Sequence, residues 1–320
     1  MRSDLLARAN DLRTHRTPFV LATVVRVERP TSAKAGDCAL VLPDGTIEGF
    51  VGGACAESTV RLQGMRQLAA GQSALLRITP AAASEPEREA EITEGLITVG
   101  NPCLSGGTLD IFLEVMRPPM LVHVFGDSPV SRALKELGQP MGWDVRSTTH
   151  PEAPILPDAA AVVVASHGAD EEQVLTSALR AEVPYVALVA SRRRGSAVLS
   201  SLDVEPALKK RVHTPAGLDI GARGPHEVAL SIIAEIIANR PASTSQASAA
   251  DVPEAGAGAA GAGDGGSAGT SVMEAADPVC GMTVAVTARS LQAEHAGKTW
   301  YFCGPGCRDA FAADPERYSA

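Results

Sequence analysis

The chain has 320 residues, of which 45% are hydrophobic, and its formal net charge is -9. This length and composition predict a globular protein of about two domains with a sizeable core. The acidic balance argues against a nucleic-acid partner, because such proteins need surplus Lys and Arg to neutralise phosphates. Charges interrupt the first residues, and no apolar run is long enough to span a membrane. We therefore expect a cytoplasmic protein with no membrane partner.

Residues 1–118 are expected to form a mixed α+β domain. Apolar and β-branched runs predict its strands, at 19–27, at 38–42 and after the turn at 43–46. A helix is expected from near Cys55 to Ala70, directly after a glycine pair, so that its first N–H groups face that turn. The stretch 81–91, rich in Ala and Glu, predicts a surface loop.

Two cysteines in this domain, Cys55 and Cys103, lie in glycine-rich turns. Glycine permits positive φ and close approach to the main chain, and a soft sulfur beside backbone N–H groups suits an anionic, sulfur- or metal-bearing ligand. The alternative is that both thiols are buried small hydrophobes beside ordinary turns. The repetition favours one ligand pocket built from Gly52, Gly53, Cys55, Glu57, Cys103, Ser105, Gly106 and Gly107.

Residues 119–240 alternate short apolar runs with helical stretches, which predicts a Rossmann-like domain of parallel βαβ units. The expected strands are at 121–125, 143–145, 160–165 and 185–190, and the last helix carries the apolar residues Val228, Ile232, Ile233, Ile236 and Ile237. Loops that follow parallel strands meet at one crevice of the sheet. The candidate ligand residues there are Gly126, Ser128, His167, Arg192, Arg193 and Asp219.

The turn after the first of these strands reads Gly126-x-Ser128-x-x-Ser131, in which two glycines of a dinucleotide fingerprint are replaced. The region 145–149 also lacks the acid that would hold a ribose. We therefore expect a Rossmann-like body that binds no ordinary dinucleotide. The cluster 192–194 is either a solvated helix start or a phosphate contact, and His167 is expected to have a structural or substrate-positioning role.

Residues 241–271 are mostly Ala, Gly and Ser, which predicts a flexible linker to a small Cys-rich α+β module at 272–320. A module of about forty residues rarely has enough core alone, and a bound metal is a common remedy. The spacing Cys303-x3-Cys307, joined by Cys280 from another turn, predicts a site for Zn(II) or Cu(I). The fourth ligand stays open between His295 and Met282.

With these residues in view, the body resembles the accessory proteins of molybdenum hydroxylases, the XdhC/CoxI family, over about residues 10–240. The resemblance rests on four segments in family order, at 52–57, 102–108, 191–194 and 215–222. The tail resembles a YHS-type metal-binding domain in its Asp-Pro-Val-Cys-Gly-Met opening at 277–282 and its Tyr-Phe-Cys core at 301–307.

The XdhC/CoxI resemblance implies a chaperone that binds the molybdenum cofactor, in its molybdopterin form, and inserts it into an apo-molybdenum hydroxylase. It implies no turnover by the chain itself. A cysteine desulfurase and a homodimer are left open as further partners. Two other functions also stay open: an NAD(P)-dependent oxidoreductase, from the βαβ pattern, and a soft-metal carrier or sensor in which the tail is the functional part.

Overall fold

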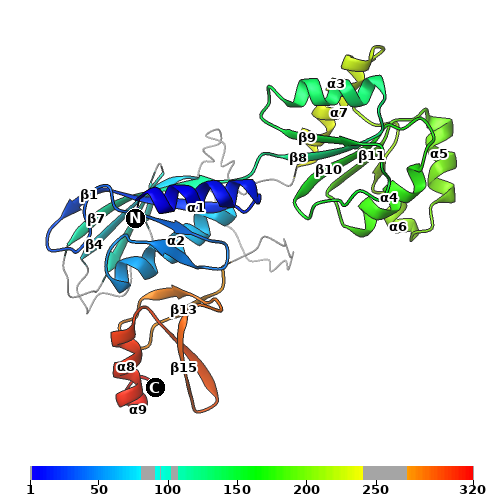
Figure 1. The fold of residues 1–320 in the computed structure, drawn as a ribbon. Coiled ribbons are helices and arrows are strands. Elements are labelled where there is room, and N and C mark those ends of the chain that lie inside the picture. The colour runs from blue at the N-terminus through cyan, green and yellow to red at the C-terminus, as the bar shows by residue number, and fades with distance from the viewer. Residues whose placement is uncertain (1, 81–90, 94, 102–106, 241–271, 320) are drawn as a thin grey trace, which may run out of the picture. The chain divides into compact units, whose positions relative to one another are not determined.

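The computed structural model describes residues 2–80, 91–93, 95–101, 107–240 and 272–319. The chain forms two compact units, one of Met1–Pro118 together with Ser243–Ala320, and one of Pro119–Ala242 (Figure 1). The tail module therefore belongs to the same unit as the N-terminal domain. Within the described ranges, no helix is both long and apolar enough to cross a membrane.

The N-terminal domain contains a seven-stranded mixed sheet in the order β3-β2-β1-β7-β4-β6-β5. Its strands are β1 Phe19–Glu28, β2 Cys38–Val41, β3 Ile47–Gly49, β4 Ala74–Pro80, β5 Glu91–Thr93, β6 Leu96–Asn101 and β7 Thr108–Met116. Only β4 and β6 pair in parallel, and all other neighbours are antiparallel. The described part of the expected loop at 81–91 is Glu91 alone, and it begins β5 instead of ending a loop.

Two helices, α1 Arg2–Thr14 and α2 Ala54–Ala70, pack on this sheet. Successive side chains of a strand point to opposite faces. In β1, Val20 and Ala22 accordingly join the core beneath α2, whereas Phe19 joins a smaller core with Leu5 of α1. The alternating apolar pattern of β1 thus supports one helix on each face.

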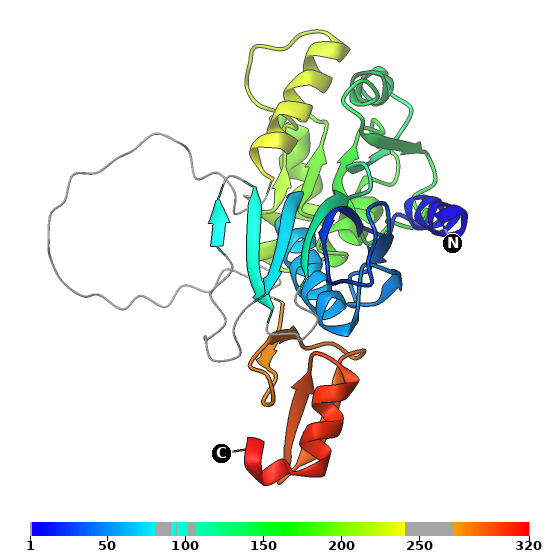
Figure 2. The same ribbon diagram turned by 90° about the vertical axis from the view of Figure 1, so that its left-hand side faces the viewer.

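The tail contains two small hairpins followed by two helices. The elements are β13 Glu274–Ala276, β14 Thr283–Ala285, β15 Leu291–His295, β16 Lys298–Phe302, α8 Pro305–Ala313 and α9 Pro315–Tyr318. Figure 2 shows α8 lying along the β15–β16 hairpin, where the buried Phe311 ring contacts the rings of Trp300 and Phe302. One aromatic cluster therefore supplies most of the apolar core on this side of the module.

The second unit is a five-stranded parallel sheet with helices on both faces, as the βαβ pattern predicts. Its strands are β8 Leu121–Phe125, β9 Asp144–Thr148, β10 Ala159–Val164, β11 Tyr185–Leu188 and β12 Val212–His213, in the order β12-β11-β10-β8-β9. Helices α3 Pro129–Gly138 and α7 Pro225–Ala238 cover one face, and α4 Glu171–Arg180 and α5 Arg192–Ser201 cover the other, with the short α6 Pro206–Lys209 following α5 (Figure 1).

Two details of this unit differ from the sequence-based expectation. The strand expected at 143–145 is β9, which continues to Thr148. In α7, Ile237 is 42% exposed, and the buried stripe instead includes Ala229 with Ile232, Ile233 and Ile236. Residues 229, 232, 233 and 236 follow the i, i+3, i+4, i+7 spacing of one helix face, which leaves Ile237 at the edge of that face.

Candidate functional site

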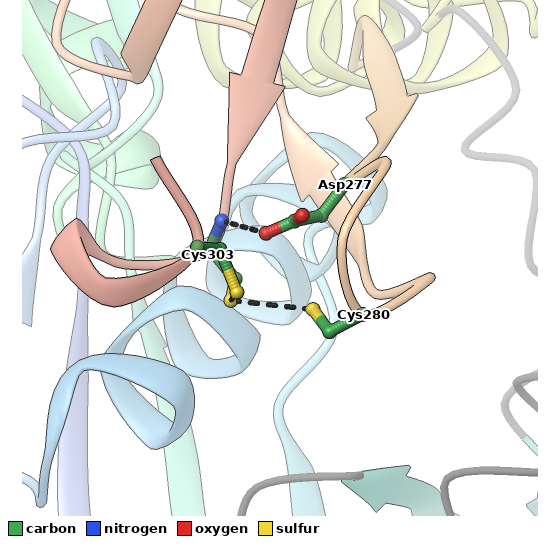
Figure 3. A group of neighbouring side chains, drawn as sticks. Asp277, Cys280 and Cys303 are labelled. Atoms are coloured by element: carbon green, nitrogen blue, oxygen red, sulfur yellow. Dashed lines mark hydrogen bonds between the residues drawn. The ribbon is translucent and has the colours of Figure 1, made fainter. Parts of the chain in front are cut away.

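Three thiols of the tail lie together in the structure. The Sγ atoms of Cys280 and Cys303 are 3.5 Å apart (Figure 3). Those of Cys303 and Cys307 are 3.7 Å apart. One carboxylate oxygen of Asp277 lies with them, so that the four ligand atoms are all within 4.8 Å of one another. We call these four residues the thiol cluster. Three sulfurs and an oxygen at this spacing suit a soft metal ion.

Asp277 explains why the two turns of the tail meet. Its side chain is 1% exposed, and its two oxygens accept hydrogen bonds from the amides of Val279 (2.9 Å) and Cys303 (2.8 Å). One carboxylate thus fixes the turn that carries Cys280 to the strand end that carries Cys303 (Figure 3). The sequence pattern included Asp277 in the opening at 277–282 but gave it no role, although an Asp that can accept the amide two residues on is typical of an Asx turn.

The thiols influence one another's ionisation. A hydrogen bond from Cys303 lowers the pKa of Cys280. Hydrogen bonds with Cys280 and with Cys55, together with burial, raise the pKa of Cys303, and burial raises the pKa of Cys307 to about 12. Cys280 is therefore the first of the three to become a thiolate. A metal that binds all three must displace protons from the other two.

His295, one of the two candidates for the fourth ligand, does not lie with the cysteines. It is paired with Lys298 at one end of the β15–β16 hairpin, whereas Leu291 and Phe302 are paired at the end next to Cys303. Four residues of strand separate the two ends by about 13 Å. The His295 ring contacts Phe311 instead, edge to face at 6.0 Å. The alternative candidate, Met282, is buried in the same apolar cluster as the three cysteines.

A second candidate site is a pocket of about 180 Å³ in the N-terminal domain. Cys55 lines it from the first turn of α2, where helix N–H groups favour a thiolate. Gly53 and Gly107, two other expected ligand residues, also line it. The full lining is Pro30, Thr31, Ser32, Gly53, Ala54, Cys55, Ala56, Ile78, Pro80, Asn101, Gly107 and Leu109.

The expected ligands Cys103, Ser105 and Gly106 lie outside the described residues. Asn101 and Gly107, which flank the segment that contains them, both line the Cys55 pocket. Gly107 has no room for a side chain, because a Cβ there would lie 2.1 Å from the carbonyl oxygen of Pro30. Both ends of the segment with Cys103 therefore reach the pocket that contains Cys55.

Two expected ligands of this region have other surroundings. Glu57 forms an ion pair with Arg61 of the same helix, at 2.8 Å, and does not line the pocket. Gly52 has a φ of +136°, which glycine adopts without strain, and a Cβ there would lie 3.0 Å from Ala56. Gly52 therefore shapes the turn that leads into α2.

A cavity of about 640 Å³ in the second unit lies at the carboxyl ends of β10, β11 and β12. His167, Arg192 and Asp219, all expected on the sequence, line it. His167 is exposed and has a φ of +55°, an uncommon conformation for a residue other than glycine. Ser191 caps α5 through a hydrogen bond from the amide of Arg194, so that the start of this helix faces the cavity.

The other expected crevice residues do not line this cavity. The amide of Gly126 donates to the carbonyl of Thr148 at 2.8 Å, and a Cβ on Gly126 would lie 2.4 Å from the carbonyl of Ala165. Ser128 is buried, and its hydroxyl accepts the amide of Ser131 at the start of α3. This turn therefore satisfies its own hydrogen bonds. Arg193 is exposed and lies outside the cavity lining.

Two acids behind the cavity were missed by sequence analysis. Glu171 is 1% exposed and accepts hydrogen bonds from the amide of Gly168 (2.9 Å) and the guanidinium of Arg194 (2.5 Å). It thereby holds the loop that contains His167 close to the start of α5. Nothing in the sequence distinguishes Glu171 from the exposed acids around it.

Glu235 of α7 is the second of these acids. It accepts hydrogen bonds from Tyr185 Oη (2.6 Å), His213 Nδ1 (2.9 Å) and the amide of Gly217 (2.7 Å). Burial opposes the charge of Glu235, but these hydrogen bonds outweigh it and lower the pKa of the carboxyl group. Burial raises the pKa of Tyr185 well above its usual value, so the phenol stays a donor. The network fixes the loop after β12 that lines the cavity.

Comparisons with known proteins match these three regions. The XdhC and CoxI family matches residues 12–79, the XdhC Rossmann domain matches residues 122–236, and the YHS domain matches residues 275–320. The two XdhC matches together cover more than half of the chain. The chain therefore belongs to the XdhC and CoxI family and carries a YHS domain.

Individual relatives are more distant. The uncharacterized protein YqeB of Escherichia coli (strain K12) is 26% identical over 265 residues, 73% of this chain and 46% of that protein. A probable xanthine dehydrogenase subunit of Bacillus subtilis (strain 168) is 27% identical over 158 residues, 42% of this chain and 47% of that protein. A copper-transporting P-type ATPase of Rhizobium leguminosarum bv. viciae is 48% identical over 42 residues, 13% of this chain and 5% of that protein. The chain spans about half the length of the first two relatives.

Proposed function

We propose that this chain is an accessory chaperone that binds the molybdenum cofactor and inserts it into an apo-molybdenum hydroxylase, without turnover of its own. Membership of the XdhC and CoxI family supports an accessory role. The Bacillus subtilis relative, named a probable xanthine dehydrogenase subunit, supports a client of the xanthine dehydrogenase type. A carbon monoxide dehydrogenase type of client and a cysteine desulfurase that sulfurates the cargo are parts of the same proposal.

The observation that carries this proposal is the Cys55 pocket. A thiol at a helix start, beside the two residues that flank a second cysteine segment, offers soft sulfur and backbone N–H groups together. The volume of about 180 Å³ is below the ~300 to 1,000 Å³ of pockets that enclose a whole small molecule. The pocket would therefore take one end of the cargo, the end where sulfurs hold the molybdenum.

The cavity of the second unit offers a different chemistry. Arg192 and the start of α5 supply a guanidinium and helix N–H groups, which bind phosphate oxygens. The cofactor carries a phosphate, and inorganic phosphate is a direct probe of this cavity. We expect binding that weakens with added salt and falls about threefold to tenfold in Arg192→Ala but not in Arg193→Ala. Equal losses in the two variants would exclude a specific phosphate site at Arg192.

The main test measures cofactor retention. Protein purified without oxygen and under reducing conditions is loaded with molybdenum cofactor, and the bound pterin and metal are measured by native mass spectrometry. We expect the wild type to retain the cofactor and Cys55→Ala to retain at least ~10-fold less. Removal of a residue that only orients a metal ligand already costs about 10- to 100-fold in affinity, and removal of the ligand itself should cost no less. Cys38→Ala, in which another partly buried thiol of the same domain is removed, should retain the cargo. Equal retention in the two variants contradicts the proposal.

A soft-metal carrier or sensor is a second candidate function, and the thiol cluster specifically favours it. Zn(II) or Cu(I) is the expected metal, and the relative named a copper-transporting ATPase supports Cu(I). If the full chain binds neither metal tightly under anaerobic reducing conditions, this candidate is excluded while the cofactor proposal stands. An NAD(P)-dependent oxidoreductase has less support, because the amide of Gly126 already donates to Thr148. Titration with NADH or NADPH tests that alternative.

A further inference from the structure

The tail module packs against α2 of the N-terminal domain. Arg66 of α2 forms a two-pronged ion pair with Glu274, with N···O distances of 2.8 and 2.6 Å. At the start of the same helix, a Cβ on Gly304 would lie 3.1 Å from the Cβ of Ala54. The contacts therefore run along α2 and place the turn before α8 directly against its first residue.

This packing brings Cys55 to the thiol cluster. Cys55 forms a hydrogen bond with Cys303 and packs in the same apolar cluster as Cys280, Cys303 and Cys307. Cys55 lies in the first turn of α2, and Cys307 lies in the first turn of α8. Two helix starts therefore carry neighbouring sulfurs. Helix starts of this kind stabilise thiolates, the form of cysteine that binds metal.

Asp277 is less suited than Cys55 to be the fourth ligand. Each of its oxygens already accepts a backbone hydrogen bond, from Val279 or from Cys303, and these bonds hold the two turns together. A soft metal also prefers thiolate to carboxylate. The sulfur of Cys55 has the preferred chemistry, and it already contacts the central thiol of the cluster.

From this arrangement we propose that one soft metal ion is bound by four sulfurs, those of Cys280, Cys303 and Cys307 from the tail and that of Cys55 from the N-terminal domain. The ion thereby fastens the tail over the pocket that Cys55 lines. The proposal concerns the metal alone and holds whether or not the chain carries a molybdenum cofactor. Asp277 is in this arrangement a positioning residue that holds Cys280 and Cys303 in place.

The chain has six cysteines, so a clean test removes the two that are not proposed as ligands. In a Cys38→Ser, Cys103→Ser background of the full chain, X-ray absorption of the Zn(II)-loaded protein should report four sulfurs around the metal. Adding Cys55→Ser should reduce this number to three and weaken Zn(II) binding by at least ~100-fold in competition with a chelator. Circular dichroism of both proteins checks that the fold is retained.

Three sulfurs in the background protein, unchanged by Cys55→Ser, would overturn the proposal and leave the fourth position to Asp277 or solvent. An oxygen ligand in the background protein that is altered by Asp277→Asn but not by Cys55→Ser would overturn it equally. These results are independent of cofactor retention, because only Zn(II) is added. Failure of the shared metal site and failure of the chaperone proposal are thus distinguishable.

Discussion

The thiol cluster and the cavity of the second unit have opposite chemistries but share one structural feature. The cluster gathers soft, partly buried sulfurs, whereas the cavity has an exposed guanidinium and an exposed imidazole at its rim. Behind each lies a carboxylate that is 1% exposed and bonded to backbone amides: Asp277 behind the sulfurs and Glu171 behind the cavity. The ligand groups of the two sites differ, but in both sites a buried carboxylate bonded to backbone amides holds them in place.

This comparison separates ligands from their supports. A ligand contacts the bound ion or molecule, so that its removal deletes an interaction outright. A support accepts backbone hydrogen bonds and fixes the turn that presents the ligand, so that its removal loosens the geometry. Substitution of a ligand should therefore have a larger effect on binding than substitution of a support, and only the loss of a ligand should change the number of atoms bound to the ion or molecule.

The largest effect is expected at the centre of the thiol cluster. Cys303 contacts Cys280, Cys307 and Cys55, so that Cys303→Ser removes the sulfur around which the others gather. We expect Zn(II) affinity to fall by at least ~1,000-fold, beyond the 10- to 100-fold typical of lost support. A chelator competition measures this. Phosphate binding in the second unit should be unchanged, and a loss there would indicate general unfolding instead.

The next largest effect tests the support beneath the sulfurs. In Asp277→Asn one carboxylate oxygen becomes an NH2 group, which cannot accept the amide of Val279 or of Cys303. We expect Zn(II) affinity to fall by about 10- to 100-fold while the number of metal-bound sulfurs stays the same. Chelator competition measures the Zn(II) affinity, and X-ray absorption measures the number of sulfurs bound to the metal. An unchanged Zn(II) affinity would show that Asp277 does not support the metal site.

The third largest effect is expected from competition between Zn(II) and the molybdenum cofactor for Cys55. This prediction rests on both the shared metal site and the chaperone proposal. If Cys55 binds the metal of the tail, the same sulfur cannot also bind molybdenum. Zn(II)-loaded protein should therefore retain the molybdenum cofactor roughly tenfold less well than metal-free protein, a difference of about 1.4 kcal/mol. Native mass spectrometry with and without chelator measures this difference. Equal retention in both states contradicts the competition, whatever the separate affinities.

Glu235 allows a similar test in the second unit. Its lowered pKa means that its stabilising effect is present above the unfolded pKa, near 4.3, and is lost as pH falls through the folded pKa. We expect Glu235→Gln to reduce the free energy of unfolding by about 1 to 3 kcal/mol at pH 7, because a charged acceptor with three donors is replaced. Denaturant unfolding at pH 7 and at pH 4 measures both quantities. The difference from wild type should shrink at pH 4, and a constant difference would argue against a role of the charge.

Sequence periodicity predicted part of the framework of the molecule. Strands β1 to β3, β8 to β11 and the helix after the glycine pair lie where the apolar patterns indicate, because each pattern reflects the burial of one face. Strands β4 to β7 of the first sheet and the short β12 of the second were not predicted. The cysteines of the tail were found from their spacing, and the structure brings all three together. Features that depend on a local pattern, such as apolar periodicity or cysteine spacing, could therefore be predicted from the sequence.

The supports and the long-range contacts were not predictable in the same way. Asp277, Glu171 and Glu235 are three among 37 acidic residues, and only the tertiary fold shows that backbone amides surround them. The contact between Cys55 and Cys303 joins residues that are far apart in the sequence, which no periodicity records. The distance between His295 and the cysteines was not predictable for a related reason. His295 is close to Cys303 in sequence, but an extended hairpin separates the two in space.

The smallest effect is expected for the ion pair between Arg66 and Glu274. Both side chains are about one-third exposed, and ion pairs of this kind contribute less than about 1 kcal/mol. If the metal fastens the tail to α2, Arg66→Ala should hardly change protease cleavage within residues 241–271 in Zn(II)-loaded protein. In metal-free protein, where contacts such as this ion pair are all that hold the tail, the same variant should be cleaved up to about fivefold faster. A matched Arg13→Ala control, altering an exposed cation of α1, should show neither change. Equal acceleration with and without Zn(II) would mean that the metal does not hold the tail in place.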